Sequence, residues 1–211
     1  MVSTISKAEL SAYDQEVFPG RIIVIQDEKE AEKACAYLAK SGAVGFDTET
    51  RPAFRKGVSH QIALMQLSTD DTCFLFRLNL IGLPDCLADI LVDPAIKKIG
   101  LSLKDDFSAI HKRKNLVPGN FLELQSFVKD YGIEDNGLQR IYGILFEKRI
   151  SKGQRLSNWE IDTLSDAQKM YAALDAWACL RIYNELKNRE KKVNTPSRPS
   201  PKAQEDGKGN D

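Results

Sequence analysis

The segment from Ser165 to about Arg189 places the strongest constraint on the fold of this chain. Ser165 and Gln168 form a capping box, a pattern that is typical of a helix start, so we predict one long helix from there. The middle of this helix reads MYAALDAWACL and is apolar on nearly all sides. Because so few of its positions are polar, we expect this helix to be buried in the core.

The segments before this helix alternate between strand and helix patterns, which favours an α/β sheet. The predicted strands are residues 21–25, 43–47, 62–68, 72–76 and 96–101, and a short extended piece begins at 121. The predicted helices are residues 27–40, 83–92, 103–112, 124–131, 137–146 and 165–189. The strands 43–47, 62–68 and 72–76 follow one another closely, and the last two are joined by a hairpin turn at 69–71. We therefore expect a locally antiparallel sheet.

A chain of 211 residues, 42% of them hydrophobic, suits one globular domain with a sizeable core. We assign residues 1–20 to an N-terminal extension, 21–190 to the folded domain and 191–211 to a disordered polar tail. The tail has three prolines and almost no large apolar residue, so burial cannot offset the entropy that its ordering would cost.

Charge and cysteine content narrow the class of protein. Thirty Lys and Arg balance thirty Asp and Glu, so a nucleic-acid binder of this composition needs a local basic surface or a bound metal. Four scattered cysteines without a CxxC pair indicate buried thiols in a reducing compartment. Without an apolar signal core or a window of about 18 apolar residues, we expect a soluble cytoplasmic protein that does not bind membranes.

Two pairs of residues are candidates for a functional site. Asp47 and Glu49 are two residues apart at the end of an apolar strand, so their side chains are expected on the same face. Tyr171 and Asp175 are one helical turn apart in the apolar helix, where a buried carboxylate requires a partner. Each pattern also occurs without function, because acids end many strands and an aromatic residue in such a helix is commonly part of the core.

Asp106 is a third candidate, at the opening of the helix that follows the strand 96–101. Acids are favoured in the first turn of any helix by the helix dipole, so this position alone does not indicate catalysis. Taken together, however, the clustered carboxylates would repel one another without a cation, and Mg²⁺ prefers oxygen ligands. The order of these acids along the chain therefore favours a metal site.

Three segments carry a resemblance to a known family. They read VGFDTET at 44–50, KKIGLSLKDDFSAI at 97–110 and RLSNWEIDTLSDAQKMYAALDAWACLRIY at 155–183. With these motifs the chain resembles the tyrosine-containing branch of the DEDD exonuclease superfamily, which includes the ribonuclease D and Werner-syndrome exonuclease domains. The resemblance implies a ribonuclease-H-like mixed sheet of about five strands, flanked by helices, and a 3′–5′ exonuclease domain over residues 21–190.

The resemblance also implies a metal-dependent phosphodiester hydrolase that uses two divalent cations, Mg²⁺ or Mn²⁺, and releases nucleoside monophosphates. The implied metal ligands are Asp47 as the bridging residue, Glu49 and Asp175 at the first cation, and Asp106 at the second. The implied catalytic residues are Tyr171, which positions the attacking water, and Glu49, which also contacts the 3′-hydroxyl. The candidate substrate contacts are Thr48, Thr50 and Arg155, with further candidate backbone contacts at Lys97, Lys98, Lys104, Lys148 and Lys152.

The expected partners are the 3′ ends of DNA or RNA, with DNA slightly favoured because the SNW and YAAxDAxA motifs resemble the Werner group. A helicase or another repair or processing protein is an open partner that the sequence does not identify. Two alternatives remain at this point: a catalytically inactive module that binds nucleic acid or protein, and an enzyme that cuts internally or hydrolyses small nucleotides. Trp159 is expected to belong to the core.

Overall fold

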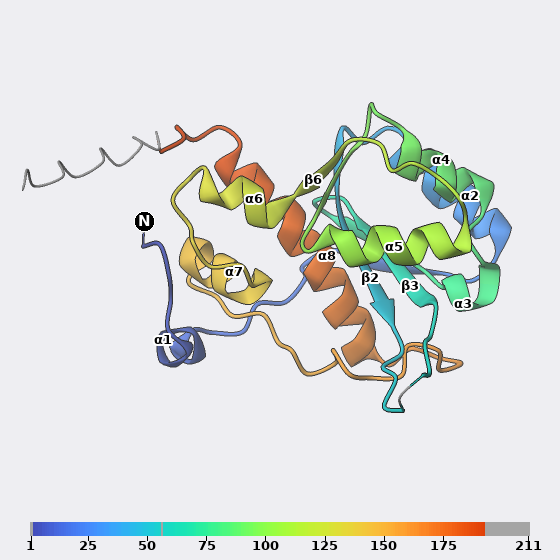
Figure 1. Ribbon diagram of the computed structural model, residues 1–211, viewed down its shortest axis with the longest axis horizontal. Coiled ribbons are helices and arrows are strands. Elements are labelled where there is room, and N and C mark those ends of the chain that lie inside the picture. Colours follow the sequence, from blue (N-terminus) through green and yellow to red (C-terminus); the bar gives the residue numbers. More distant parts are fainter. Residues whose placement is uncertain (1, 56, 193–211) are drawn as a thin grey trace, which may run out of the picture.

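The computed structural model describes residues 2–55 and 57–192, so nearly all of the tail assigned to 191–211 lies outside the described residues. The strands are β1 (Arg21–Ile25), β2 (Ala43–Thr50), β3 (Ile62–Ser68), β4 (Thr72–Phe76), β5 (Lys97–Gly100) and β6 (Phe121–Glu123). The helices are α1 (Lys7–Ala12), α2 (Glu28–Leu38), α3 (Leu78–Ile81), α4 (Asp85–Val92), α5 (Leu103–Arg113), α6 (Leu124–Lys129), α7 (Leu138–Phe146) and α8 (Asp166–Leu186). Figure 1 shows their arrangement.

The strands form one mixed sheet in the order β1-β4-β3-β2-β5-β6. β3 runs antiparallel to both β2 and β4, which confirms the predicted antiparallel centre. The other three pairs, β1 with β4, β2 with β5 and β5 with β6, are parallel. The mixed sheet confirms the predicted fold class, and the short extended piece predicted from residue 121 forms the sixth strand, β6, which has only three residues.

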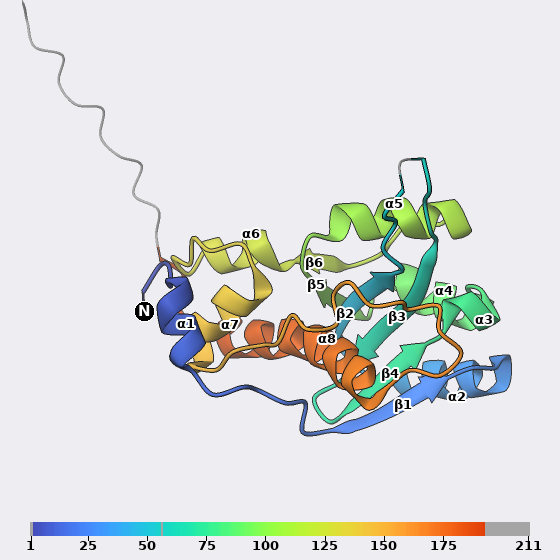
Figure 2. The same cartoon turned by 90° about the horizontal axis from the view of Figure 1, so that it is seen from below.

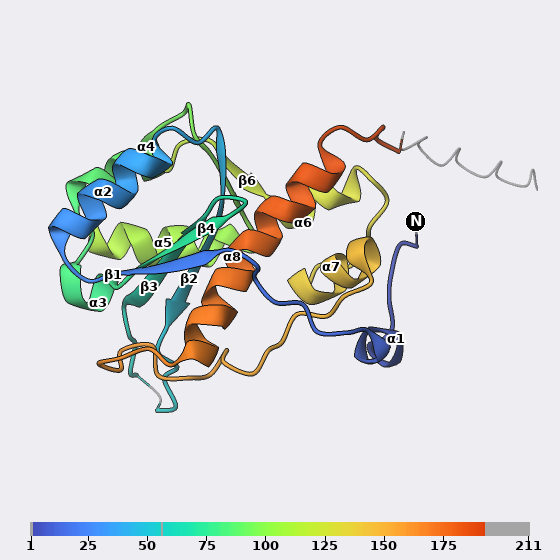
Figure 3. The same cartoon turned by 180° about the vertical axis from the view of Figure 1, so that it is seen from behind.

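The sheet separates two layers of helices and two hydrophobic cores. One core joins the sheet to α6, α7 and α8, and the other joins it to α2, α4 and α5. α5 lies in front of the sheet in Figure 1, whereas α8 lies in front when the molecule is seen from behind in Figure 3. Within residues 2–55 and 57–192, no helix is both long enough and apolar enough to cross a membrane.

The N-terminal residues lie along α7 and α8 (Figure 2). Ile5 and Phe18 are buried, and the backbone N–H of Ile5 donates to the Asp135 carboxylate over 2.9 Å. Glu16 accepts hydrogen bonds from Tyr142 and Arg181, each over 2.7 Å. These contacts attach the segment that we assigned to an extension, 1–20, to the body of the domain over its described part, 2–20.

α8 crosses β2 at very close range, and Gly45 is the residue that permits it. A Cβ atom at this position would lie 1.8 Å from the carbonyl oxygen of Ala176 in α8. No side chain fits at such a distance, so the two backbones approach only because residue 45 is glycine. The crossing places Asp175, the residue before Ala176, next to the end of β2.

We predict that Gly45→Ala lowers the free energy of unfolding by about 1–3 kcal/mol or more, because α8 must move away from β2 to make room for the methyl group. Gly42→Ala is the matched control, since a Cβ at Gly42 meets no atom within 4 Å. Chemical denaturation of both variants measures the effect. An equal free energy of unfolding for Gly45→Ala and Gly42→Ala would contradict the close approach of α8 to β2.

Candidate active site

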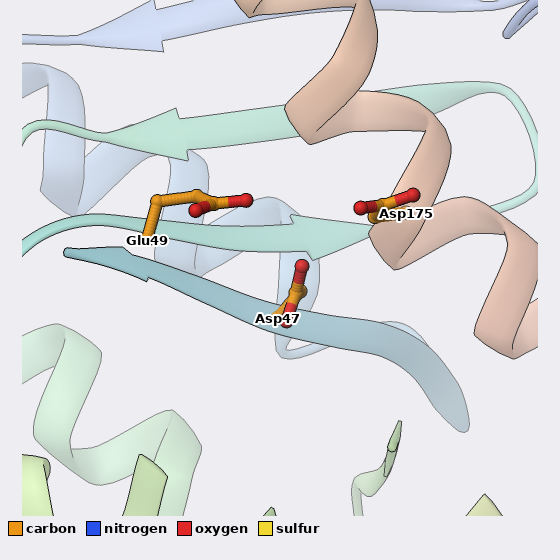
Figure 4. Close-up of side chains that lie close together, drawn as sticks. All are labelled: Asp47, Glu49 and Asp175. Atoms are coloured by element: carbon orange, nitrogen blue, oxygen red, sulfur yellow. The ribbon is translucent and has the colours of Figure 1, made fainter. Parts of the chain in front are cut away.

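The end of β2 directs two carboxylates toward α8. Val44 and Phe46 belong to the core that β2 shares with α2, α4 and α5, so the alternating residues face the other side of the sheet. Gly45 contacts α8, and Asp47 and Glu49 follow it on the same face. The close-up in Figure 4 shows both side chains beside Asp175 of α8, as their spacing in the sequence predicts.

Asp47, Glu49 and Asp175 form a compact cluster. Each contributes one carboxylate oxygen, and these three oxygens lie within 4.8 Å of one another. Only 9% of Glu49 is exposed, and the other two residues are half-buried. Three oxygen donors at such separations suit a hard divalent cation, which would also neutralise their mutual repulsion.

The pKa values of the three carboxyl groups reflect this crowding. Burial, with the negative charges of its carboxylate neighbours, raises the pKa of Asp47 well above its usual range. The same causes raise the pKa of Glu49 to about 9. Burial raises the pKa of Asp175 to about 7, although the Tyr171 hydroxyl and the positive charge of Lys152 lower it. The cluster is therefore costly to ionise unless a cation compensates it.

Asp106 approaches the cluster from α5, on the other side of the sheet. The Thr48 hydroxyl, which points away from α8, donates a hydrogen bond to the Asp106 carboxylate. Burial raises the pKa of Asp106 to about 6, partly offset by this hydrogen bond. Its neighbour Asp105 is exposed, which favours Asp106 as the functional residue of the two. Asp106 lies outside the group of oxygens within 4.8 Å.

Glu123 at the end of β6 is a residue of the site that the sequence patterns did not indicate. Its carboxylate accepts hydrogen bonds from the backbone N–H groups of Ser102 and Leu103, over 3.0 and 2.8 Å. These are the first free donors of α5, so Glu123 caps the helix that carries Asp106. An acid directly after a short extended segment was the only signal in the sequence, and such acids are too common to identify a cap between distant elements.

Tyr171 lies one turn before Asp175 and is half-buried. Burial and the negative charges of Asp175 and Glu49 raise the pKa of its phenol above the usual value. The phenol therefore remains protonated at neutral pH and is able to donate a hydrogen bond. Trp159, which is fully buried as predicted, supports it with ring centroids 6.0 Å apart.

Two cationic side chains share a cavity with the site. Lys152 and Arg155 line a cavity of about 150 Å³ together with Tyr171 and Asp175. Both cations are exposed, so they are available to an anionic ligand. Of the other predicted substrate contacts, Thr50 is exposed at the end of β2, whereas the Thr48 hydroxyl is bonded to Asp106.

The suggestion that Lys98 contacts the nucleic-acid backbone was wrong. Lys98 is fully buried, and its ammonium group donates to the backbone carbonyl of Asp93 over 2.7 Å. Lys97 donates to the Tyr183 hydroxyl, and Lys148 pairs with Asp14. A local sequence pattern does not separate a buried lysine from a free one, because the difference depends on contacts made after folding.

Residues 22–191 match the family model described as 3′–5′ exonuclease. The chain belongs to the 3′–5′ exonuclease family. This match confirms the resemblance to the DEDD exonucleases, and it covers nearly all of the described residues.

The chain is also similar in sequence to individual proteins that are named 3′–5′ exonucleases. The chain is 29% identical over 181 residues to the mouse bifunctional 3′–5′ exonuclease/ATP-dependent helicase WRN, a match to 81% of this chain and 13% of that protein. It is 30% identical over 187 residues to a 3′–5′ exonuclease of Arabidopsis thaliana, covering 81% of this chain and 65% of that protein. It thus spans less than two thirds of either relative. The structure of Escherichia coli RNase D has the same fold, with a TM-score of 0.72, 21% identity, and 79% of this chain and 44% of that chain covered.

The raised pKa values predict how the stability of this exonuclease-family chain depends on pH. In the folded, metal-free protein Asp175 and Glu49 keep protons up to about pH 7 and 9, whereas unfolded carboxyl groups lose them near pH 4. The folded state binds more protons in this range, so its stability falls as pH rises from about 5 to about 9. Thermal unfolding in a chelator measures the fall.

Added Mg²⁺ or Mn²⁺ is expected to reverse most of this loss, with the larger gain at higher pH, because cations bind the deprotonated carboxylates. Asp47→Asn is the control, since its neutral amide removes one charge from the cluster and flattens the pH dependence. A melting temperature that is constant with pH in the chelated wild-type protein would contradict the prediction.

Proposed function

We propose that this chain is a metal-dependent 3′–5′ exonuclease that hydrolyses nucleic acid to nucleoside monophosphates. One observation carries the proposal: three carboxylates from β2 and α8 converge within 4.8 Å beside a protonated tyrosine. Membership of the 3′–5′ exonuclease family gives this arrangement its reaction class. An inactive binding module would be expected to have lost part of such a costly cluster, yet all four acids and Tyr171 are present.

The proposed cation ligands are Asp47, Glu49, Asp106 and Asp175. Asp47 would contribute to both cation positions, Glu49 and Asp175 would help to hold the first cation, and Asp106 would help to hold the second. Two Mg²⁺ or Mn²⁺ ions, when bound, would stabilise the attacking and leaving oxygens of the phosphodiester together. The Thr48 hydroxyl orients the Asp106 carboxylate, and Glu123 fixes the helix from which it extends.

Tyr171 and Glu49 are the proposed catalytic residues. Because the phenol of Tyr171 is protonated, it positions the attacking water through a hydrogen bond and does not act as a strong base. Glu49 additionally accepts a hydrogen bond from the 3′-hydroxyl of the substrate. This contact would explain the direction of hydrolysis, since an internal nucleotide has no free 3′-hydroxyl.

Phosphate binding is proposed to involve Arg155 and Lys152, which share a cavity with Tyr171 and Asp175. In a chain with a formal net charge of zero, local cations and bound metal must supply the attraction for phosphate. Thr50, exposed at the end of β2, is a further proposed contact. Thr48 is proposed to act indirectly, through the hydrogen bond that its hydroxyl donates to the Asp106 carboxylate.

The terminal base is proposed to lie in a second cavity beside the end of β2. This cavity has a volume of about 490 Å³, and its lining includes Arg51, Phe54, Arg55 and Leu156. Phe54 is 82% exposed and Leu156 is 61% exposed, although both side chains are apolar. Aromatic and guanidinium groups stack on any base, so a cavity of this kind would tolerate different sequences.

The proposed substrate is a nucleic-acid 3′ end, with DNA slightly ahead of RNA. The mouse relative is named as both an exonuclease and a helicase, whereas Escherichia coli RNase D is described as an exoribonuclease involved in structured RNA processing. The SNW and YAAxDAxA motifs, which resemble the Werner group, favour DNA, and the helicase in the name of the mouse relative makes a helicase a candidate partner. Parallel assays on recessed DNA, single-stranded DNA and RNA discriminate between the substrates.

We predict that Asp47→Ala and Asp175→Ala each lower metal-dependent release of mononucleotides by about 100-fold or more, because each removes a group that holds charge at the reacting phosphate. Asp105→Ala is the matched control, because Asp105 is an exposed acid close to the site. A 5′-labelled substrate gives the rate and shows whether products form a ladder from the 3′ end. Retained activity in either of the first two variants, at unchanged stability, would exclude these metal ligands.

Tyr171→Phe is expected to slow hydrolysis by about 100-fold while leaving the affinity for Mn²⁺ nearly unchanged. The variant loses the hydrogen bond to the attacking water but keeps the carboxylates and the aromatic ring that packs near Trp159. Single-turnover kinetics and calorimetry measure the two quantities separately. Wild-type turnover would reduce Tyr171 to a packing residue.

A further inference from the structure

Gln66 in β3 is a buried polar residue whose role is open. Its exposed fraction is 0%. Among the residues described by the structure, Gln66 is the one whose side chain has two buried polar atoms, Nε2 and Oε1, both without a hydrogen-bond partner. A buried amide without partners is unfavourable, so its presence calls for a physical explanation.

The register of the sheet places Gln66 beside the carboxylate cluster. Asp47 in β2 lies directly opposite Gln66 in β3, and Glu49 lies opposite Leu64. Residues opposite each other in an antiparallel pair project to the same face, with their Cβ atoms about 5 Å apart. Gln66 is therefore the cross-strand neighbour of Asp47, with its side chain on the same face of the sheet.

The packing of β3 agrees with this placement. Leu64 belongs to the core that contains α8, whereas Met65 and Leu67 belong to the core on the opposite face. Gln66 therefore faces α8, the helix that carries Asp175. Ser68, the next residue on the same face, already donates its hydroxyl to the backbone carbonyl of Thr69 over 2.9 Å.

A carboxylate that holds a cation is commonly oriented by a second hydrogen-bonding partner. The amide of Gln66 has two N–H donors, and its terminal torsion is soft, so Nε2 can turn toward Asp47 without a change in the backbone. We propose that Gln66 is a positioning residue, whose side-chain amide donates a hydrogen bond to Asp47 and fixes the direction in which this carboxylate holds a cation. This inference rests on the proposed function of the cluster as a cation site.

Gln66→Met tests the proposal, because methionine has a similar volume and cannot donate a hydrogen bond. The variant is expected to bind Mn²⁺ about 10- to 100-fold more weakly than the wild type. Without metal it should melt at the same or a higher temperature, since apolar atoms replace two unpaired polar ones. Leu64→Met is the matched control on the same face of β3 and should keep wild-type affinity. Titration calorimetry and thermal unfolding in chelator measure these quantities.

A second measurement does not depend on the folding of any variant. In wild-type protein labelled with ¹⁵N-glutamine, Mg²⁺ should shift the Gln66 side-chain amide resonance and slow its hydrogen exchange, as a new hydrogen bond requires. An unchanged resonance in the presence of bound Mg²⁺ would overturn the role of Gln66. A Gln66→Met variant that binds Mn²⁺ as tightly as the wild type would also overturn this role.

Mn²⁺ binding to the wild type separates the role of Gln66 from the proposed function of the cluster. If the wild type binds Mn²⁺ and Gln66→Met binds it equally well, the role of Gln66 falls while the proposed function stands. If the wild type binds no Mn²⁺ at all, both fall.

Discussion

The close crossing of α8 over β2 is the contact on which the rest of the site depends. Gly45 leaves no atom between the strand and the helix, since a Cβ there would meet the Ala176 carbonyl oxygen at 1.8 Å. Only at this separation can Asp175 reach the carboxylates of Asp47 and Glu49. The apolar surface of α8 provides the energy for the contact, because most of its circumference is buried in the core. The packing of α8 on β2 that completes the core therefore also brings the three carboxylates together.

The crossing creates an electrostatic cost that a cation is suited to remove. Burial raises the pKa values of the three clustered carboxyl groups, and for Asp47 and Glu49 the neighbouring negative charges raise them further. The protein without a cation therefore holds protons where it would otherwise hold negative charge. The cluster is thus an unfavourable feature of the fold that becomes favourable on metal binding. In a chain with zero net charge, bound cations would also supply much of the attraction for phosphate.

The sequence predicted those parts that depend on local patterns. β1, β3 and β4 have the predicted bounds because each is a short apolar run between turn residues. The capping box of Ser165 and Gln168 is present at the start of α8. The i, i+2 and i, i+4 spacings placed Asp47 with Glu49 and Tyr171 with Asp175, and α8 brings the two pairs together.

The features that the sequence did not predict depend on contacts between distant segments. The short extended piece at β6 was predicted, but its parallel pairing with β5 was not. The burial of Lys98 depends on the carbonyl of Asp93, which accepts a hydrogen bond from its ammonium group. The cap that Glu123 forms on α5 joins residues that are 20 and 21 positions apart in the sequence, and no periodic pattern predicts it. Gln66 resembles any strand residue until the register with Asp47 is known.

The carboxylates that α8 brings together form the proposed divalent cation site. Diffraction from crystals soaked in Mn²⁺, with data collected near the manganese absorption edge, tests it most directly. We expect an anomalous peak between Asp47, Glu49 and Asp175, and a second peak between Asp47 and Asp106. The absence of any peak beside Asp47 at saturating Mn²⁺ would contradict it.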